Sequence, residues 1–285
     1  MFRAHVCIFA TDRSVSPSVL AQAVEVRGLD GVFFPEHTHL PVSSRSPFFP
    51  GGVVPEPYKR TYDPFVALAM AGAVTERIML GTGICLVTEH DPIVLAKTVA
   101  SLDRLTGGRV ILGVGAGWNA EEMENHGTPY RARWAVLRER ILAMREIWRR
   151  EEAEFHGNYV SFNRMWSWPK PLQPAGPPVW IGSNSSYSAS RVAEYADGWM
   201  PIVGRQGGGN AQRIAQACAR LGRPREQVTL ALFYASIDES EARVRLAEGY
   251  TDFIFGLPSA GEAEVFPVLD QISTLAARLR AAANG

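Results

Sequence analysis

The sequence has few cysteines, no excess of charge of either sign and no long apolar run. Its three cysteines, Cys7, Cys85 and Cys218, are far apart and show no CxxC spacing, which argues against a disulfide framework or a zinc ribbon. Lysine plus arginine and aspartate plus glutamate both number 29, so no basic surface is predicted for nucleic acid or anionic lipid. No segment approaches the ~18 apolar residues of a membrane span, and the apolar run near the N-terminus is too short for a signal sequence. We therefore expect a cytoplasmic protein with neither a nucleic-acid nor a membrane partner.

The sequence does contain a regular alternation of short apolar runs and longer segments with helical periodicity. With 46% hydrophobic and 20% charged residues, the chain can bury a large core. The apolar runs lie at 5–10, 31–37, 77–85, 109–117, 177–182, 198–203, 227–234 and 251–258. Runs without a polar face are typical of parallel strands that are covered on both sides, and eight strand–helix units close into a barrel. The pattern predicts an α/β fold, a single (β/α)8 TIM barrel over residues 1–285.

Two stretches interrupt this repeat and predict long loops at the C-terminal face of the barrel. Residues 40–61 contain five prolines and two adjacent phenylalanines. Residues 151–177 are expected to include a small hairpin around Gly157, followed by a connection that carries Trp166. The helix predicted over 131–150 has an apolar stripe that serves either the barrel or a partner subunit.

Polar residues gather where the predicted strands end, which is where barrels of this type carry their active sites. Glu36, His37 and His39 directly follow the second strand. A histidine here suits proton transfer or polarisation of a substrate oxygen. The His-x-His spacing also admits a metal site, but the remaining histidines do not supply further ligands at strand ends, so no metal is predicted. A third interpretation is a pair of loop histidines without a chemical role.

Two other strand ends suggest ligand contacts. Glycines in LGTGI (80–84) and GVGAG (113–117) do not match the dinucleotide fingerprint, but they indicate either a crowded interior or the close approach of a flat ring to the backbone. Gly182, Ser183 and Asn184 lie between the fifth strand and the next helix, where they either cap the helix or form an anion site. Arg205 would add a positive charge to such a site.

Several longer segments together resemble one known family. They are EHTHLPVSSRSPFFPGG, TYDPFVALAMAGAVTERIMLGTGICLV, DPIVLAKTVASLDRLTGGRVILGVGAGWNAEEMENHG and PPVWIGSN…ADGWMP. In this order and with these loop lengths, they resemble the luciferase-like flavin monooxygenase superfamily, and more narrowly its branch of oxidoreductases that use the deazaflavin coenzyme F420. The resemblance covers about residues 20 to 202, and the combination of LDRLTGGR with LGVGAGW is its most specific part.

The resemblance implies a barrel with a deazaflavin ring at the strand ends and the cofactor phosphate on the loop after the fifth strand. It implies a role for His37 near the reactive face of the ring, and a cis peptide between Gly83 and Ile84 against the ring. Glu36, which precedes His37 at the same strand end, is also predicted to be catalytic. The cofactor-binding residues expected on this basis are Thr82, Gly83, Ile84, Gly115, Asn119, Gly182, Ser183, Asn184 and Arg205. The expected apolar substrate wall consists of Phe48, Phe49, Trp118 and Trp166.

The function expected from this resemblance is hydride transfer between coenzyme F420 and a small organic substrate that the sequence does not identify. An FMN-dependent monooxygenase on the same fold is the main alternative. A metal hydrolase built on His37 and His39, and a non-catalytic flavin-binding protein, are two further alternatives. A homodimer that pairs through barrel helices is also expected from the resemblance.

Overall fold

The computed structural model describes residues 2–48, 51–205 and 211–283, and it confirms the predicted barrel. Eight parallel strands close in the order β1-β10-β9-β8-β7-β4-β3-β2. Their bounds are β1 Arg3–Cys7, β2 Gly31–Phe34, β3 Met79–Thr82, β4 Val110–Val114, β7 Val179–Ile181, β8 Gly198–Trp199, β9 Thr229–Phe233 and β10 Asp252–Gly256. The strands are shorter than the apolar runs that predicted them, because each run continues into the loop at the mouth.

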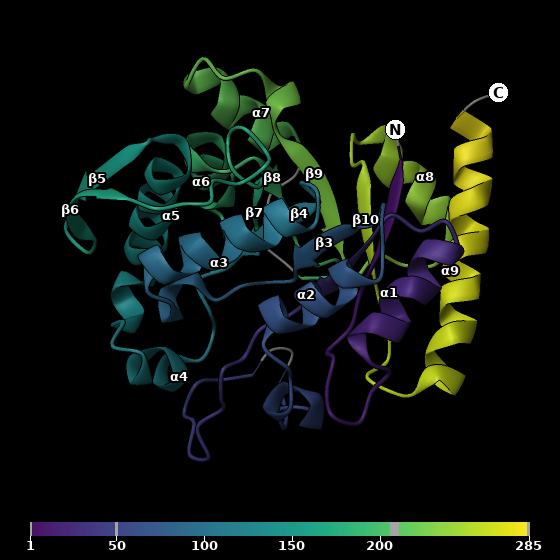
Figure 1. Ribbon diagram of the computed structural model, residues 1–285. Helices are drawn as coiled ribbons and strands as arrows, with labels where there is room; N and C mark the ends of the chain where they lie inside the picture. The colour runs from purple at the N-terminus through teal and green to yellow at the C-terminus, as the bar shows by residue number, and fades with distance from the viewer. Residues whose placement is uncertain (1, 49–50, 206–210, 284–285) are drawn as a thin grey trace.

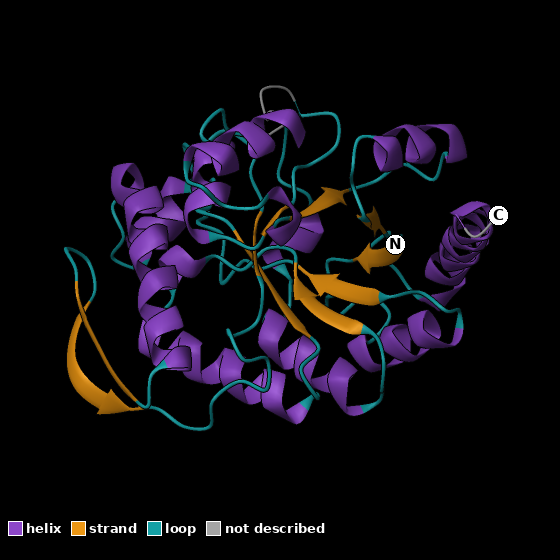
Figure 2. Cartoon of the chain, turned by 90° about the horizontal axis from the view of Figure 1, so that it is seen from above, coloured by secondary structure: helices purple, strands orange, loops and turns teal. Residues whose placement is uncertain are grey.

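Helices surround these strands, as the view down onto the molecule shows (Figure 2). Their bounds are α1 Pro17–Val26, α2 Pro64–Ala73, α3 Pro92–Leu105, α4 Ala120–Asn125, α5 Arg133–Arg149, α6 Ser188–Tyr195, α7 Ala211–Arg220, α8 Glu239–Ala247 and α9 Glu262–Ala283. The chain colours of Figure 1 follow the same alternation of strand and helix from β1 to α9. The predicted hairpin is confirmed as the antiparallel pair β5 (Glu152–His156) and β6 (Ser161–Trp166), which stands outside the ring of helices in Figure 2.

Local sequence signals explain where several helices begin and end. Asp63 and Asp91 accept hydrogen bonds from backbone N–H groups in the first turns of α2 and α3, each followed by a proline at the first helical position. After α3, Gly107 and Gly108 adopt φ values of 74° and 80°, which are open to glycine but strained for other residues. The first three βα units therefore begin and end close to the predicted positions.

The core has two layers. Phe33, Ile111, Trp180, Met200 and Phe233 fill the inside of the barrel, whereas the larger cluster lies between the strands and the helices. The apolar stripe of α5 belongs to this chain's own core, because its central residues Leu137, Ile141, Met144 and Trp148 are buried. The alternative that this stripe binds a partner subunit is therefore not supported.

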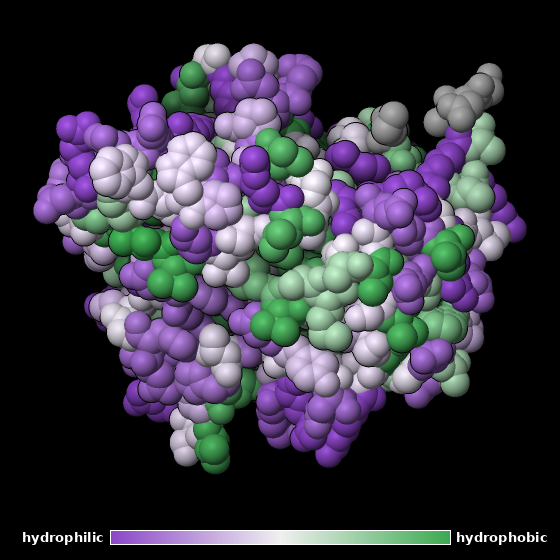
Figure 3. Space-filling model, in the orientation of Figure 1, coloured by the Kyte–Doolittle hydropathy of each residue, from purple (hydrophilic) through white to green (hydrophobic). Residues whose placement is uncertain are grey.

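Apolar residues also remain on the surface. Figure 3 shows them among polar residues on the face formed by α2 and α3. The exposed residues of these two helices include Val66, Met70, Val94 and Leu105. The homodimer stays a prediction. Among the described residues, no helix combines the length and apolar character that a membrane crossing requires.

Ion pairs and hydrogen bonds hold the N-terminal end of the barrel. Asp252, at the start of β10, is fully buried and bonds to Arg3 at 2.7 and 2.8 Å and to His5 Nε2 at 2.9 Å. Arg109, just before β4, donates hydrogen bonds to Thr106 O, Thr75 Oγ1, Ile78 O, Gly72 O and Thr75 O. These contacts join neighbouring βα units at the end opposite to the site described next.

Candidate active site

A cavity of ≈ 280 Å³ opens at the C-terminal ends of the strands. Many of the residues predicted to form the site line it together: Glu36, His37, Phe48, Gly83, Ile84, Trp118, Gly182, Ser183, Asn184 and Arg205. Sequence reasoning missed the lining residues Phe9, Tyr58, Trp134, Phe233 and Tyr234. The sequence does not mark these residues as site residues, because a single aromatic residue in a loop or at a strand end looks the same as an ordinary core residue.

His37 is the best-oriented polar group of this cavity. Its Nδ1 lies 2.8 Å and 3.1 Å from the two carboxylate oxygens of Glu122, and the two side chains are only 6% and 1% exposed. The indole N–H of Trp118 points at Nε2 from 3.4 Å. Because the indole N–H can only donate, Nε2 accepts this long hydrogen bond and the proton of His37 lies on Nδ1, toward the carboxylate. Both His37 and Trp118 line the cavity.

Glu122 was not predicted as a site residue, because residues 118–131 were expected to form a loop, whereas residues 120–125 form the helix α4. Asn119 caps α4 instead, and its side-chain oxygen accepts the backbone N–H of Glu122 at 3.0 Å. The predicted residue Asn119 is buried and does not line the cavity. Its contact is with the helix that carries Glu122 to His37. The signal available in the sequence was the Asn-x-x-Glu spacing of a helix start.

Glu36 is buried, and both of its oxygens already have partners. His90 Nε2 lies 2.7 Å from one oxygen, and the backbone N–H of Leu86 donates to the other at 2.6 Å. Burial lowers the pKa of His90, but the hydrogen bond and charge of Glu36 outweigh this and raise it. These contacts tie the loop after β2 to the loop after β3. The catalytic role expected for Glu36 stays a prediction, and Glu36 lines the cavity beside His37.

The two histidines behind the metal hypothesis have separate partners. His37 binds Glu122, whereas His39 binds Thr38 Oγ1 at 2.9 Å and Asn125 at 2.8 Å. Within the described ranges, the group of three possible metal ligands that lies within bonding reach of one ion is Glu36, Cys85 and His90, which includes neither His37 nor His39. The hydrolase alternative consequently has no geometric support.

Only some of the residues predicted to form a glycine-lined floor line the cavity. The Gly83–Ile84 peptide is cis, as expected, and both residues line the cavity. Gly115 does not line it, because a Cβ there would lie 1.9 Å from the side chain of Ile84. Thr82 is buried and donates its hydroxyl to Gly113 O at 2.7 Å. These two predicted cofactor contacts instead face neighbouring parts of the protein.

Aromatic side chains form a wall around His37. The rings of Tyr58 and Trp118 lie 5.3 and 6.0 Å from the His37 ring, and Phe48 contacts both of them at 5.3 and 5.5 Å. Trp166 does not belong to this wall, because it is 72% exposed in the β5–β6 hairpin and does not line the cavity. The prediction for Phe49 lies outside the described residues.

Glu121 holds the long loop that carries Phe48. Its carboxylate accepts hydrogen bonds from the hydroxyls of Ser44 and Ser46 and from the backbone N–H of Arg45, at 3.2, 2.7 and 2.9 Å. The bond from Ser46, followed by the bond from the Arg45 backbone, lowers the pKa of Glu121 to about 2. The loop is therefore fastened to the N-terminal turn of α4, and the aromatic wall is preformed.

The residues predicted to form an anion site, Gly182, Ser183, Asn184 and Arg205, also line the cavity. The side-chain amide of Asn184 makes two hydrogen bonds to the backbone of Ile202: it donates to Ile202 O at 3.0 Å and accepts from Ile202 N at 2.9 Å. This joins the loops after β7 and β8 beside Gly182 and Ser183. Burial lowers the pKa of Arg205, which lines the same cavity near Tyr58 and Tyr234. Tyr234 has a φ of 59°, a strained value for a residue other than glycine.

Comparison with known proteins assigns the chain to a family. A family model described as luciferase-like monooxygenase matches residues 18–282. The chain belongs to the luciferase-like monooxygenase family. An uncharacterized protein of Mycobacterium tuberculosis is 38% identical over 279 residues, which cover 95% of this chain and 96% of that protein. The F420-dependent hydroxymycolic acid dehydrogenase of the same organism is 34% identical over 140 residues, which cover 48% of this chain and 38% of the dehydrogenase.

Solved structures of the luciferase-like fold give the same picture. An F420-dependent secondary alcohol dehydrogenase in complex with an F420-acetone adduct superposes with a TM-score of 0.71 at 15% identity, covering 96% of this chain and 98% of its own. Monooxygenase RslO1 from Streptomyces bottropensis gives the same TM-score and coverage at 19% identity. These likenesses show the shared fold. As a member of the luciferase-like monooxygenase family, the chain is an oxidoreductase.

Proposed function

We propose that this luciferase-like protein transfers a hydride between coenzyme F420 and a small organic substrate. In this reaction an alcohol is oxidised to a carbonyl compound, or the carbonyl compound is reduced to the alcohol. The observation that carries the proposal is the orientation of His37. A buried carboxylate holds its Nδ1, and Nε2 accepts only a long 3.4 Å hydrogen bond from Trp118, which a substrate oxygen bound in the cavity would replace. The substantial identity to an F420-dependent dehydrogenase over part of the chain supports a deazaflavin rather than FMN.

The residues of the cavity fit a flat cofactor with an anionic tail. Gly83, Ile84 and Gly182 line the cavity, and the Ile84 side chain packs over Gly115 and against Gly182 to give an apolar floor. Arg205 provides a positive charge near the loop at Ser183. When bound, a deazaflavin supplies a hydride acceptor or donor. The protein would orient it and shield it with the aromatic wall.

The chemistry left to the protein is proton transfer at the substrate oxygen. Oxidation of an alcohol removes a hydride from carbon and a proton from oxygen, and Nε2 of His37 is placed to accept that proton. Glu122 stabilises the positive charge that then develops on the ring, because its carboxylate contacts Nδ1. In the direction of carbonyl reduction, the same nitrogen returns the proton. A correctly placed proton donor or acceptor of this kind contributes roughly 10²–10⁴-fold to a rate.

Equilibrium binding distinguishes this function from the FMN alternative. Titration of the purified protein with F420 and, separately, with FMN is followed by the absorbance change of each cofactor. We expect saturable F420 binding that is at least about tenfold tighter than FMN binding. Ser183→Asp, which places a negative charge in the anion site, should weaken F420 binding, whereas Ser190→Asp on the exposed face of α6 should not. Tight FMN binding without F420 binding would favour the monooxygenase and overturn the proposal.

A further inference from the structure

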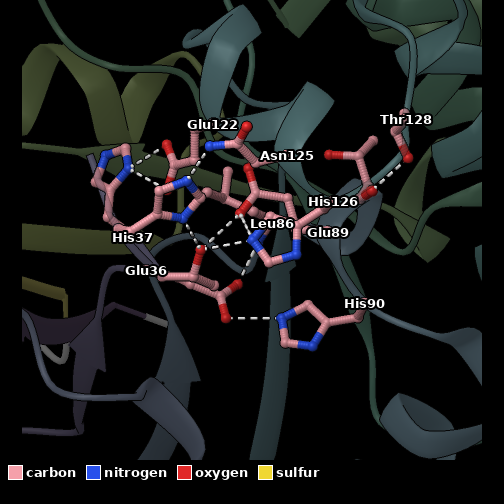
Figure 4. A network of polar contacts seen from close by, with 12 residues as sticks. Glu36, His37, Leu86, Glu89, His90, Glu122, Asn125, His126 and Thr128 are labelled. Atoms are coloured by element: carbon pink, nitrogen blue, oxygen red, sulfur yellow. Dashed lines mark hydrogen bonds and ion pairs between the residues drawn. The ribbon is translucent and has the colours of Figure 1, made fainter. Parts of the chain in front are cut away.

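Three buried carboxyl groups lie together behind His37, and only two of them have strong partners. Glu122 contacts His37, and Glu36 contacts His90. The third, Glu89 at the end of the short 3-10 helix Val87–Glu89, has a side chain that is 1% exposed. It contacts the Thr38 hydroxyl at 3.5 Å and His126 Nε2 at 3.7 Å. Figure 4 shows Glu89 beside His126, with Glu36 and Glu122 close by.

A carboxylate in this position is costly to keep ionised. Burial removes its hydration, and the negative charges of Glu122 and Glu36 repel it. In the described part of the chain, no arginine or lysine forms an ion pair with Glu89. Burial first, and then Glu122 and Glu36, raise the pKa of Glu89 to about 9. Glu89 therefore holds its proton at neutral pH.

Glu89 also has a route to solvent that does not pass through the active-site cavity. The Thr38 hydroxyl lies 2.7 Å from His126 Nε2 and 2.9 Å from His39 Nδ1. Glu89 and His126 line a separate groove of ≈ 360 Å³ between the loop after β3, α5 and the β5–β6 hairpin. Burial and the nearby His39 lower the pKa of His126, so that its imidazole is neutral and able to accept a proton.

The other charged groups of this groove do not replace His126. Arg140 of α5 donates to Val87 O at 2.9 Å, and its guanidinium is near Asp91. His90 is engaged with Glu36 at 2.7 Å. Cys85 is also close to Glu89 and Glu36, but burial raises the pKa of its thiol, so it stays neutral. Among the described residues, the neighbours that act on Glu89 are the two carboxylates on its inner side and the Thr38–His126 pair on its outer side.

We propose that Glu89 is a proton store coupled to His37. The inference rests on the proposed function. When Nε2 of His37 takes the hydroxyl proton of the substrate, the ring becomes positive, and Glu89 releases one proton to water through the Thr38 hydroxyl and His126. The hydride goes to the cofactor, His37 gains one positive charge, and Glu89 gains one negative charge. The total charge of the cluster is unchanged, and in carbonyl reduction both proton movements reverse.

No proton has to pass directly from His37 to Glu89, because the coupling is electrostatic. A neutral His37 leaves the charge of Glu122 uncompensated, and that charge keeps the proton on Glu89. A positive His37 offsets Glu122 and allows Glu89 to ionise. Glu122 therefore links the cavity to the groove by contacting His37 on one side and repelling Glu89 on the other.

Infrared spectroscopy of the cofactor-free protein tests the store without relying on any turnover. At pH 7 the wild type should show the carbonyl band of a protonated carboxylic acid, which disappears as the pH rises through about 9. The band should be missing in Glu89→Gln and retained in Glu124→Gln, a matched variant of an exposed glutamate on α4. A spectrum without a band that depends on Glu89 would overturn the inference.

Turnover in weak and strong buffer tests the route to solvent, including the case in which Glu89→Gln does not fold. In dilute buffer, His126→Ala should slow turnover about tenfold, and added imidazole should restore it, because a small base replaces the missing proton carrier. His156→Ala in the hairpin should show neither effect. An unchanged rate in His126→Ala, or a loss that imidazole does not restore, would overturn the route. If the band is present but F420 supports no turnover, the proposed function is wrong, whereas the conclusion that Glu89 is protonated at pH 7 is kept.

Discussion

The two ends of the barrel use buried polar groups differently. At the N-terminal end, the charge of Asp252 is paired with Arg3 and His5, and the guanidinium of Arg109 donates to four backbone carbonyls and the Thr75 hydroxyl. At the mouth, Nε2 of His37 accepts a long hydrogen bond from Trp118 at 3.4 Å, and Glu89 contacts Thr38 and His126 at 3.5 and 3.7 Å. Polar groups with short contacts within the chain stabilise the fold, whereas groups with long, weak contacts remain available for chemistry. Substitutions at the N-terminal end should therefore change stability, and substitutions at the mouth should change activity.

The largest effect on stability is expected for Asp252→Asn, measured as the free energy of unfolding in urea. Removal of this charge leaves Arg3 and His5 without their partner and should cost about 3 kcal/mol at pH 7. Asp270→Asn is the matched control, because Asp270 pairs with Arg27 but is 65% exposed, and its loss should cost less than about 1 kcal/mol. Equal costs for the two variants would contradict the stabilising role of the N-terminal end.

The same aspartate predicts a pH dependence. Burial alone would raise the pKa of Asp252, but the hydrogen bonds and charges of His5 and Arg3 outweigh it and lower the pKa to about 2. Because the folded value lies below the unfolded value of about 3.9, the contribution is complete above pH 5 and is lost as the pH falls toward 2. The wild type should lose about 2–3 kcal/mol over this range that Asp252→Asn does not lose.

A smaller effect, this time on rate, is expected for Glu122→Gln at the mouth. The amide keeps a contact with His37 but removes the charge that stabilises the protonated ring, so turnover should fall about tenfold, equivalent to about 1.4 kcal/mol. Stability should change little. A variant that loses stability but not rate would show that Glu122 belongs with the structural groups of the N-terminal end.

The smallest effect is expected for Glu121→Ala, which releases the loop over the aromatic wall. Trypsin should cleave after Arg45 a few times faster than in the wild type, because the backbone of Arg45 is no longer held. The substrate KM should rise by a similar factor. Glu124→Ala is the control. Equal cleavage rates in the two variants would show that Glu121 does not hold the loop in place.

Much of the fold was predictable because it depends on patterns that are local in the sequence. Apolar runs and Asp-Pro helix starts located the strands and the helices α2 and α3, and the strand ends brought His37, Gly83, Gly182 and Arg205 to one cavity. Contacts between distant segments were not predictable in the same way. The carboxylate of Glu122 reaches His37 because Asn119 caps a helix that carries Glu122 toward it. The Ile84 side chain occupies the space beside Gly115, at the point where β3 continues into the cis Gly83–Ile84 peptide.

The central claim is that His37 moves the substrate's proton while the cavity binds a deazaflavin. The most direct measurement follows F420 absorbance anaerobically with a panel of alcohols, in the wild type and in His37→Gln. We predict that both bind F420 with equal affinity, that the wild type bleaches it with at least one alcohol, and that His37→Gln does so at least about 100-fold more slowly. Equal bleaching rates in the two proteins, or bound F420 that no alcohol reduces, would contradict the account.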